Sequence, residues 1–389
     1  MTTLKVLHVI PSIGPARGGP SFVIRTLASG QAERGMDVHV AGTDDNGPLQ
    51  RTPPVSVPFT EGNVTYWIFP RQTRLYLFSF PLTRWLWRHA REFDVIHIHA
   101  LFSYSAIAAA VAAARAGVPY IVRPLGTLNR WGMLNRRRRL KKWSYRLIES
   151  RILRGAAAIQ YTCEQEAAEA RELGVPDSGV VVPNPVDLCY AAPTPAANPG
   201  RSPSLLFLSR LDAKKGLELL LAAFARVRCH YPAAILVIAG DGPAEFVEGL
   251  KRQSRQLGEE SAVVWAGFLQ GEAKSKALAQ ADVFVLPSHS ENFGVAVVEA
   301  MGAGLPVVVS DQVGIHREVS DAGAGLVTEC TVDSLEAALL QVLGDSALRA
   351  TMAQCAVELA RTFSREAVAQ QLAELYATIR SGHRQPIAA

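Results

Sequence analysis

Short apolar runs alternate with longer stretches of helical spacing along the whole chain. The runs have the length and the β-branched composition of buried strands. They cover residues 5–10, 37–41, 64–69, 94–98, 119–123, 157–161, 180–182, 204–208, 234–239, 262–266, 282–286, 305–309 and 325–327. Strands that alternate with helices predict an α/β fold with parallel sheets and crossover helices. Because such sheets bind ligands at the carboxyl ends of their strands, the loops after these runs are the first places to search for a site.

A stretch rich in Pro and Ala, residues 191–200, interrupts this alternation and reads as a linker between two domains. A length of 389 residues also fits two domains. The halves differ in charge: residues 1–195 carry 23 Lys and Arg against 14 Asp and Glu, whereas the rest carries 17 against 21. We therefore expect the two halves to face different partners.

Composition excludes several classes of protein. The chain is 49% hydrophobic, which is too apolar for a disordered protein. Its five cysteines form no C-x-x-C pair, so neither a disulfide scaffold nor a structural zinc site is expected. No run approaches the ~20 apolar residues of a membrane span, and Lys5–Ile10 lacks the features of a signal peptide. We expect a reduced, cytoplasmic protein.

Two loops of the basic half carry candidate chemistry. Gly18 and Gly19 follow the first strand and precede a helix, where the backbone could approach an anion, although a plain tight turn fits as well. His97 and His99 point the same way if residues 94–98 form a strand. A histidine in an apolar run is more often a core residue, but His99 stands at the strand end.

Two loops of the acidic half carry charged groups. Arg210 and Lys215 follow the strand at 204–208, where a guanidinium and an ammonium could neutralise a diphosphate. Two solvated cations are the simpler alternative. Glu291 and Glu299 lie eight positions apart and converge best if Glu291 is in a loop and Glu299 is in the helix that follows. Because the valines at 295, 297 and 298 are poor helix formers, a strand remains an alternative for this segment.

Taken together, these loops resemble the motifs of family 4 retaining glycosyltransferases, in the same order over nearly the whole chain. The likeness rests on the early Gly-Gly loop, the strand end HIHA, the loop SRLDAKKG and the segment SENFGVAVVEAMGAGLPVVVS. It implies a GT-B fold, in which two Rossmann-like domains face each other across a deep cleft and a C-terminal helix crosses back. Residues 1–190 with helix 364–381 would form the acceptor-binding domain, and residues 200–363 the domain that binds the nucleotide sugar.

The same resemblance implies a role for each residue. Such enzymes transfer a sugar from a nucleoside diphosphate sugar with retained anomeric configuration and require no metal or other cofactor. Arg210 and Lys215 would stabilise the leaving diphosphate, and His99 would contact the donor sugar near the reacting centre. Glu291 would bind a sugar hydroxyl and Glu299 the ribose hydroxyls. The loop of residues 265–269 would line the nucleobase. The other implied donor contacts are Gly18, Gly19, Asn292, Phe293, Gly294, Val295, Gly267, Phe268 and Leu269.

Two departures from the family pattern affect the choice of donor, which we expect to be a UDP- or GDP-sugar. Ser209 replaces a glycine often found there, and Asn292 stands where glycine is commoner. A nucleotide-sugar epimerase of the same fold is the main alternative, and a catalytically idle membrane-surface scaffold is another. A hydride-transferring Rossmann enzyme is disfavoured because G-x-G-x-x-G is absent.

A basic segment, residues 135–148, predicts an amphipathic helix suited to an anionic membrane surface. Its predicted membrane or acceptor contacts are Arg136, Arg137, Arg138, Arg139, Lys141, Lys142 and Trp143. A solvated helix face is the simpler alternative, and nucleic acid is disfavoured because no binding motif accompanies the charge. The aromatic segment 75–87 could be core, touch lipid or line the acceptor entrance. We expect a peripheral protein on the inner face of the cell membrane, with a glycan or polyprenyl-diphosphate-linked acceptor.

Overall fold

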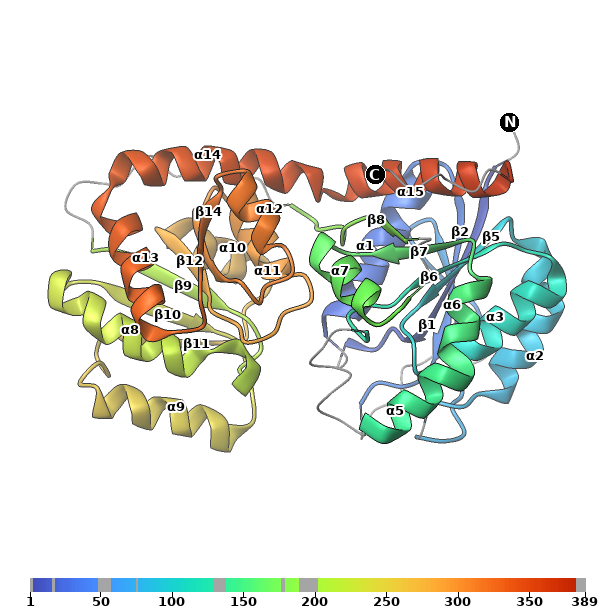
Figure 1. The fold of residues 1–389 in the computed structure, drawn as a ribbon, viewed down its shortest axis with the longest axis horizontal. Coiled ribbons are helices and arrows are strands. Elements are labelled where there is room, and N and C mark those ends of the chain that lie inside the picture. The colour runs from blue at the N-terminus through green and yellow to red at the C-terminus, as the bar shows by residue number, and fades with distance from the viewer. Residues whose placement is uncertain are drawn as a thin grey trace. The chain divides into compact units, whose positions relative to one another are not determined.

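The computed structural model describes residues 3–15, 18–47, 57–74, 76–128, 138–175, 179–188 and 202–382. These residues divide into two units (Figure 1). The N-terminal unit comprises Met1–Pro185 and Arg365–Ala389, and the C-terminal unit comprises Val186–Ser364. The boundaries predicted from the sequence, at residues 190 and 363, lie within a few residues of these limits.

An eight-stranded sheet forms the centre of the N-terminal unit, in the order β3-β4-β2-β1-β5-β6-β7-β8. All neighbouring strands are parallel except β3, which pairs antiparallel with β4. The strands are β1 (Lys5–Ser12), β2 (Asp37–Thr43), β3 (Phe59–Glu61), β4 (Val64–Phe69), β5 (Val95–His99), β6 (Tyr120–Arg123), β7 (Ala158–Tyr161) and β8 (Gly179–Val181). The sequence missed β3, a three-residue edge strand too short to show a period.

Helices cover both faces of this sheet, because its strands are apolar on both sides. One face packs against α2, α3, α6 and α7, and the other packs against α1 and α15. Figure 1 shows α15, the last helix of the chain, beside α1. The helical segments are α1 (Gly19–Glu33), α2 (Phe80–His89), η2 (Ala90–Glu92), α3 (Tyr104–Ala116), α5 (Arg138–Ser144), η3 (Tyr145–Glu149), α6 (Ser150–Gly155), α7 (Glu164–Glu172) and α15 (Arg365–Arg380).

The C-terminal unit contains a six-stranded, fully parallel sheet in the order β11-β10-β9-β12-β13-β14. Its strands are β9 (Ser204–Leu208), β10 (Ile235–Ala239), β11 (Val263–Gly267), β12 (Val283–Leu286), β13 (Val307–Ser310) and β14 (Gly325–Thr328). Its helical segments are η4 (Ala213–Lys215), α8 (Leu217–His230), α9 (Ala244–Gln256), α10 (Gly271–Gln280), α11 (Val295–Gly302), α12 (His316–Asp321), α13 (Val332–Gly344) and α14 (Ser346–Thr362). The predicted architecture of two parallel α/β sheets is thus confirmed.

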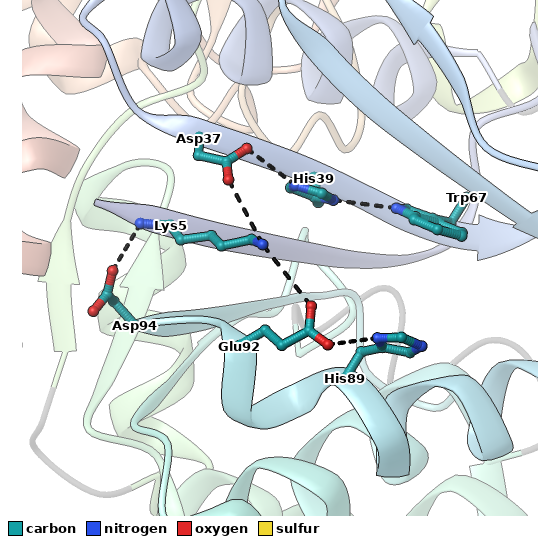
Figure 2. A network of polar contacts seen from close by, with 7 residues as sticks. All are labelled: Lys5, Asp37, His39, Trp67, His89, Glu92 and Asp94. Carbon is teal, nitrogen blue, oxygen red and sulfur yellow. Dashed lines mark hydrogen bonds and ion pairs between the residues drawn. The ribbon is translucent and has the colours of Figure 1, made fainter. Parts of the chain in front are cut away.

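Charged side chains gather at the amino ends of β1 and β2 in the N-terminal unit (Figure 2). The Lys5 ammonium lies 3.7 Å from Asp37 and 3.9 Å from Glu92, and the Lys5 backbone N–H donates to Asp94 at 2.8 Å. Asp37 also contacts His39 at 3.0 Å. Most of these side chains are partly exposed, so each pair contributes little stability. The network lies at the edge opposite to the one where parallel sheets bind ligands.

Among the described helices, none is long and apolar enough to cross a bilayer. The Ala-rich segment at residues 105–114 forms most of α3 and packs in the core.

Candidate functional site

Both sheets change winding direction at one point, and the predicted site residues follow the strands there. In the C-terminal unit the chain proceeds from β9 outwards to β11 and then returns to β12, on the other side of β9. In the N-terminal unit β1 and β5 are the corresponding pair. Loops diverge at such a point, which is where open α/β sheets bind ligands.

Lys215 and Glu291 meet at the switch point between β9 and β12. The Lys215 ammonium donates to the Glu291 carboxylate and forms an ion pair with it. The Lys215 side chain is only 5% exposed and that of Glu291 24%. The two loops are also joined through their backbones, because the N–H of His289 donates to the carbonyl of Lys214 at 2.8 Å. The structure therefore places two predicted residues, 76 positions apart, in direct contact.

Local sequence explains how Lys215 reaches this position. Asp212 accepts a hydrogen bond from the backbone N–H of Lys214 and so begins the short turn η4. Gly216 ends the turn at φ 66°, and a Cβ there would lie 2.0 Å from the carbonyl oxygen of Pro287. Only glycine allows this approach, so Gly216 fixes the separation of the two loops.

Glu291 is held by its backbone and stays ionised. Its N–H donates to Gln312 at 3.0 Å, and its carbonyl accepts from Gly314 at 2.8 Å. Burial alone would raise the pKa of the carboxyl, but the Lys215 ammonium outweighs it and the pKa lies below the usual 4.5. The backbone N–H of Phe293 lowers it further. Glu291 is thus a hydrogen-bond acceptor in a fixed place.

Helix α11 begins directly after this loop, as the helical alternative predicted. Gly294 is its N-cap at φ 101°, Val295 is the first helical residue, and Phe293 is 2% exposed. Asn292 is partly buried. The loop before α11 therefore brings the Glu291 carboxylate and a helix N-terminus together, and the ion pair adds the Lys215 cation from the loop after β9.

Glu299 lies one turn into α11, where its carboxylate accepts a hydrogen bond from the Lys274 ammonium at 2.8 Å. Lys274 comes from α10, the helix that follows the predicted nucleobase loop. Sequence reasoning missed Lys274, because a lysine on an exposed helix face carries no motif. A ribose that binds Glu299 must share its carboxylate with this lysine or displace it.

The remaining predicted donor residues lie at strand ends. Arg210 is exposed and makes no ion pair within the described residues. Gly267 ends β11 at φ 67°, and Phe268 beside it is 60% exposed. Leu269 is partly buried. A pocket of about 350 Å³ adjoins Gly267 and Trp265.

A Gly-Asp-Gly turn after β10 also lines this pocket, and the sequence analysis missed it. A Cβ on Gly240 would lie 1.8 Å from the carbonyl oxygen of Ser209, and one on Gly242 would lie 2.1 Å from that of Leu211. The turn thus packs against the loop that bears Arg210. The signal was present in the sequence as Gly-Asp-Gly-Pro directly after a buried strand.

In the N-terminal unit the glycine loop after β1 leads into α1. Gly18 is the N-cap at φ 72° and ψ −140°, a conformation that L side chains avoid, and Gly19 is the first helical residue. Among the described residues, a Cβ on either glycine would meet no atom within 4 Å. This space beside Gly18 and Gly19 fits the predicted approach to an anion.

His99 ends β5 and is 0% exposed, so it makes no contact with solvent. It lies against His8 and His97, both also fully buried. Burial lowers the pKa of His8 from 6.5 to about 4 and holds those of His97 and His99 well below 6.5. The three imidazoles are therefore neutral at pH 7. The predicted contact of His99 with a sugar requires the surrounding loops to open.

These three histidines could hold a metal by distance alone, since their ring nitrogens lie within 4.8 Å of one another. The buried guanidinium of Arg123 argues against this, because its charge disfavours a cation on each imidazole. No carboxylate belongs to the group. The cluster therefore fits a hydrogen-bond network better than a metal site.

Backbone strain marks the same edge of the sheet. Ala100 directly follows β5 at φ 67°, Phe102 has φ 55°, and Leu125 after β6 has φ 56°. Such conformations are costly for residues other than glycine and cluster at functional sites. This observation supports a site at the carboxyl ends of β5 and β6.

The predicted membrane residues are described only in part. Arg136 and Arg137 lie outside the described residues, and only the helical backbone of Arg138 and Arg139 in α5 is described. Lys142 is exposed and Lys141 partly so. Trp143 is 63% exposed, so in the described structure it is a surface residue and not part of an apolar stripe packed in the core.

Two family models match the chain, one in its N-terminal half and one in its C-terminal half. A model described as glycosyl transferase 4-like domain matches residues 18–185, and one described as glycosyl transferases group 1 matches residues 193–358. The chain is 33% identical over 205 residues to phosphatidyl-myo-inositol mannosyltransferase of Mycolicibacterium smegmatis. This match covers 51% of the chain and 52% of the relative, so it spans about half the length of that protein.

Two solved structures share the fold at low identity. Sucrose-phosphate synthase from Thermosynechococcus elongatus is 21% identical, with a TM-score of 0.77 over 97% of this chain and 100% of that one. HepE of Anabaena in complex with UDP is 20% identical, with a TM-score of 0.74 over 96% and 100%.

Proposed function

The chain belongs to the glycosyl transferases group 1 family in its C-terminal half and to the glycosyl transferase 4-like family in its N-terminal half, and from this we propose that it is a retaining glycosyltransferase with a nucleoside diphosphate sugar as donor. Its fold is that of GT-B enzymes. The observation that carries the proposal is the Lys215–Glu291 pair at the switch point of the C-terminal sheet. Core packing alone would not require an ion pair at that place.

We propose the following division of roles. The reaction breaks the bond between the anomeric carbon and the diphosphate oxygen, whose electron pair leaves with the diphosphate. Lys215, the nearby Arg210 and the N-terminus of α11 oppose the negative charge that develops there. The acceptor oxygen bonds to the anomeric carbon, and its proton passes to the leaving diphosphate or to water. Glu291 binds a hydroxyl of the sugar, and Glu299 binds the ribose.

The donor is a UDP- or GDP-sugar in this proposal, and no other cofactor takes part. The solved complex of HepE with UDP supports a uridine nucleotide, since it shares the fold. The pocket of about 350 Å³ beside Trp265 and Gly267 borders the predicted nucleobase loop. Phe268, Leu269 and the backbone of residues 292–295 complete the proposed donor contacts, with Gly18 and Gly19 on the diphosphate.

We place the acceptor at an anionic membrane surface. Helices α2, α3 and α6 pack against one face of the N-terminal sheet, α3 contacts both α2 and α6, and α5 leads into α6 (Figure 1). Over residues 80–89, 104–116 and 138–155 the sequence has ten Lys and Arg and a single acid, Glu149, which is fully buried. This helical face therefore attracts anionic lipid headgroups without an opposing carboxylate.

Large apolar side chains stand among these cations. Trp87 is 56% exposed, Trp143 63% and Leu147 51%. The Arg115 guanidinium lies 5.7 Å from the ring centre of Trp87. Aromatic rings between cations are typical of surfaces that sit at the headgroup level of a bilayer. We propose peripheral binding at the inner face of the cell membrane and a lipid-linked or glycan acceptor, which is consistent with the lipid named in the mannosyltransferase relative.

A nucleotide-release assay tests the proposal. Purified protein is incubated with UDP- and GDP-sugars, with and without a membrane extract that supplies acceptors. Release of one nucleoside diphosphate that depends on the extract supports transfer. Conversion of the donor without release indicates the epimerase, and vesicle binding without any turnover indicates the scaffold.

A further inference from the structure

Five fully buried polar side chains connect the last helix of the chain to the end of β5. His8 comes from β1, Gln31 from α1, His97 and His99 from β5, and Tyr376 from α15. Each of the five is 0% exposed. Buried polar groups destabilise a protein unless they form hydrogen bonds, so a group of five such side chains requires an explanation.

Four hydrogen bonds join these residues into one chain. His99 Nε2 lies 2.9 Å from His8 Nδ1, and His8 Nε2 lies 2.6 Å from the Oε1 of Gln31. The Gln31 Nε2 donates to the Tyr376 hydroxyl at 2.9 Å. That hydroxyl lies 2.7 Å from His97 Nδ1. The bonds thereby link β1 and β5 to α1 and α15, the two helices that pack against the same face of the sheet.

The side-chain amide of Gln31 determines which atom donates in each hydrogen bond of this network. Its Oε1 can only accept, so His8 must carry its proton on Nε2. A neutral His8 then has a lone pair on Nδ1, which must accept from a proton on His99 Nε2. At the other end, the Tyr376 hydroxyl accepts from Gln31 and donates to His97. His99 is therefore left with a lone pair on Nδ1.

We infer that Gln31 and Tyr376 are positioning residues that hold His99 as the Nε2–H tautomer, so that its Nδ1 accepts a hydrogen bond from a sugar hydroxyl. The inference rests on the proposed function for the identity of that donor. Among the described residues, Nδ1 of His99 has no hydrogen-bond partner, although the ring is fully buried. His97 Nε2 of the same network also has no partner among the described residues, but only His99 stands at the carboxyl end of the strand, where parallel sheets bind ligands.

The position of His99 agrees with a ligand at that atom. It is the last residue of β5, at the switch point of the N-terminal sheet, and the strained Ala100 follows it. A neutral imidazole suits a hydroxyl, because a charged one could not accept from it. The network thus makes Tyr376 of α15, which lies 277 positions after His99 in the sequence, a part of the site.

The test compares Tyr376→Phe with Tyr120→Phe. Tyr120 is a matched control, since it is a buried tyrosine of the same unit whose hydroxyl donates to the carbonyl of Ile152 at 2.8 Å, outside the network. Imidazole ¹⁵N spectra at pH 7.5, assigned with His99→Gln, report the tautomer of His99 on the protein alone. Steady-state kinetics with the active donor give kcat and KM.

We expect His99 to be protonated at Nε2 in the wild type and in Tyr120→Phe, and to become a mixture of tautomers in Tyr376→Phe. Tyr376→Phe should lower kcat about tenfold, with KM for the donor within twofold, while Tyr120→Phe keeps both values. A wild-type His99 protonated at Nδ1, or equal spectra and kcat in the two variants, would overturn the inference. Absence of turnover with every donor would contradict the proposed function instead, and the spectra would still decide the tautomer.

Discussion

Lys215 and Glu291 form a largely buried ion pair at the carboxyl ends of the neighbouring strands β9 and β12. The close approach of Gly216 to Pro287 fixes the turn that bears Lys215, and two backbone hydrogen bonds fix Glu291. Both charges are therefore fixed before any ligand arrives, which is the condition for strong electrostatic stabilisation of a leaving group.

Lys215→Ala should reduce turnover at least a hundredfold with the fold intact. Loss of one such contact costs about 3 kcal/mol of transition-state stabilisation, which corresponds to roughly that factor. The measurement is kcat for nucleotide release, beside a circular dichroism spectrum. Arg226→Ala removes an exposed ion-paired cation of the same unit and serves as the control, with unchanged kcat. Near-normal turnover in Lys215→Ala would refute the role given to this lysine.

Glu299→Ala should also leave the fold intact and cut turnover at least a hundredfold, because the ribose loses its anchor. Weaker binding is the expected cause, so the dissociation constant of the nucleoside diphosphate should rise tenfold or more in calorimetry. Lys274→Ala frees the carboxylate of its 2.8 Å partner and should change that constant only a few fold. Equal losses in both variants would show that the ion pair, and not the carboxylate, carries the effect.

The buried histidines should make stability depend on pH. Burial lowers the pKa of His8 from 6.5 to about 4, so the unfolded chain binds its proton first. The contribution of His8 to the free energy of unfolding therefore has its full value above pH 6.5 and decreases as the pH drops towards 4. Urea midpoints measured between pH 7.5 and 5 should fall less steeply in His8→Gln than in the wild type. The exposed His230→Gln should keep the wild-type slope. Parallel slopes in all three proteins would count against a neutral His8.

Vesicle binding should depend on anionic lipid and on salt. The protein should sediment with vesicles of phosphatidylcholine and phosphatidylglycerol but not with phosphatidylcholine alone, and 0.5 M salt should release most of it, because screening shortens the reach of the cations. Trp143→Ala should weaken binding severalfold. Leu257→Ala, an exposed apolar residue of the other unit, is the control. Equal sedimentation with neutral vesicles would contradict an electrostatic surface.

Much of the fold was predictable because its strands are buried on both faces and read as apolar runs. The helix after Gly294 was ambiguous, since Val297 and Val298 favour strands, and tertiary packing decided it. The contact of Lys215 with Glu291 was not predictable from spacing, because it depends on which strands become neighbours.

Lys274 and Tyr376 were missed for a different reason. Each lies on an ordinary amphipathic helix, and only the packed structure shows what its polar atom meets. His99 illustrates the converse, since the sequence left open a core position and a place at a strand end, and the structure shows both.

The most direct test of the donor site is a thermal-shift series of the wild type and Lys215→Ala with UDP, GDP, ADP and NAD. The proposed function predicts that one nucleoside diphosphate raises the melting temperature of the wild type by several degrees, that NAD has no effect, and that Lys215→Ala loses most of the shift. Stabilisation by NAD alone, or no shift with any of the four, would contradict a donor site at Lys215 and Glu291.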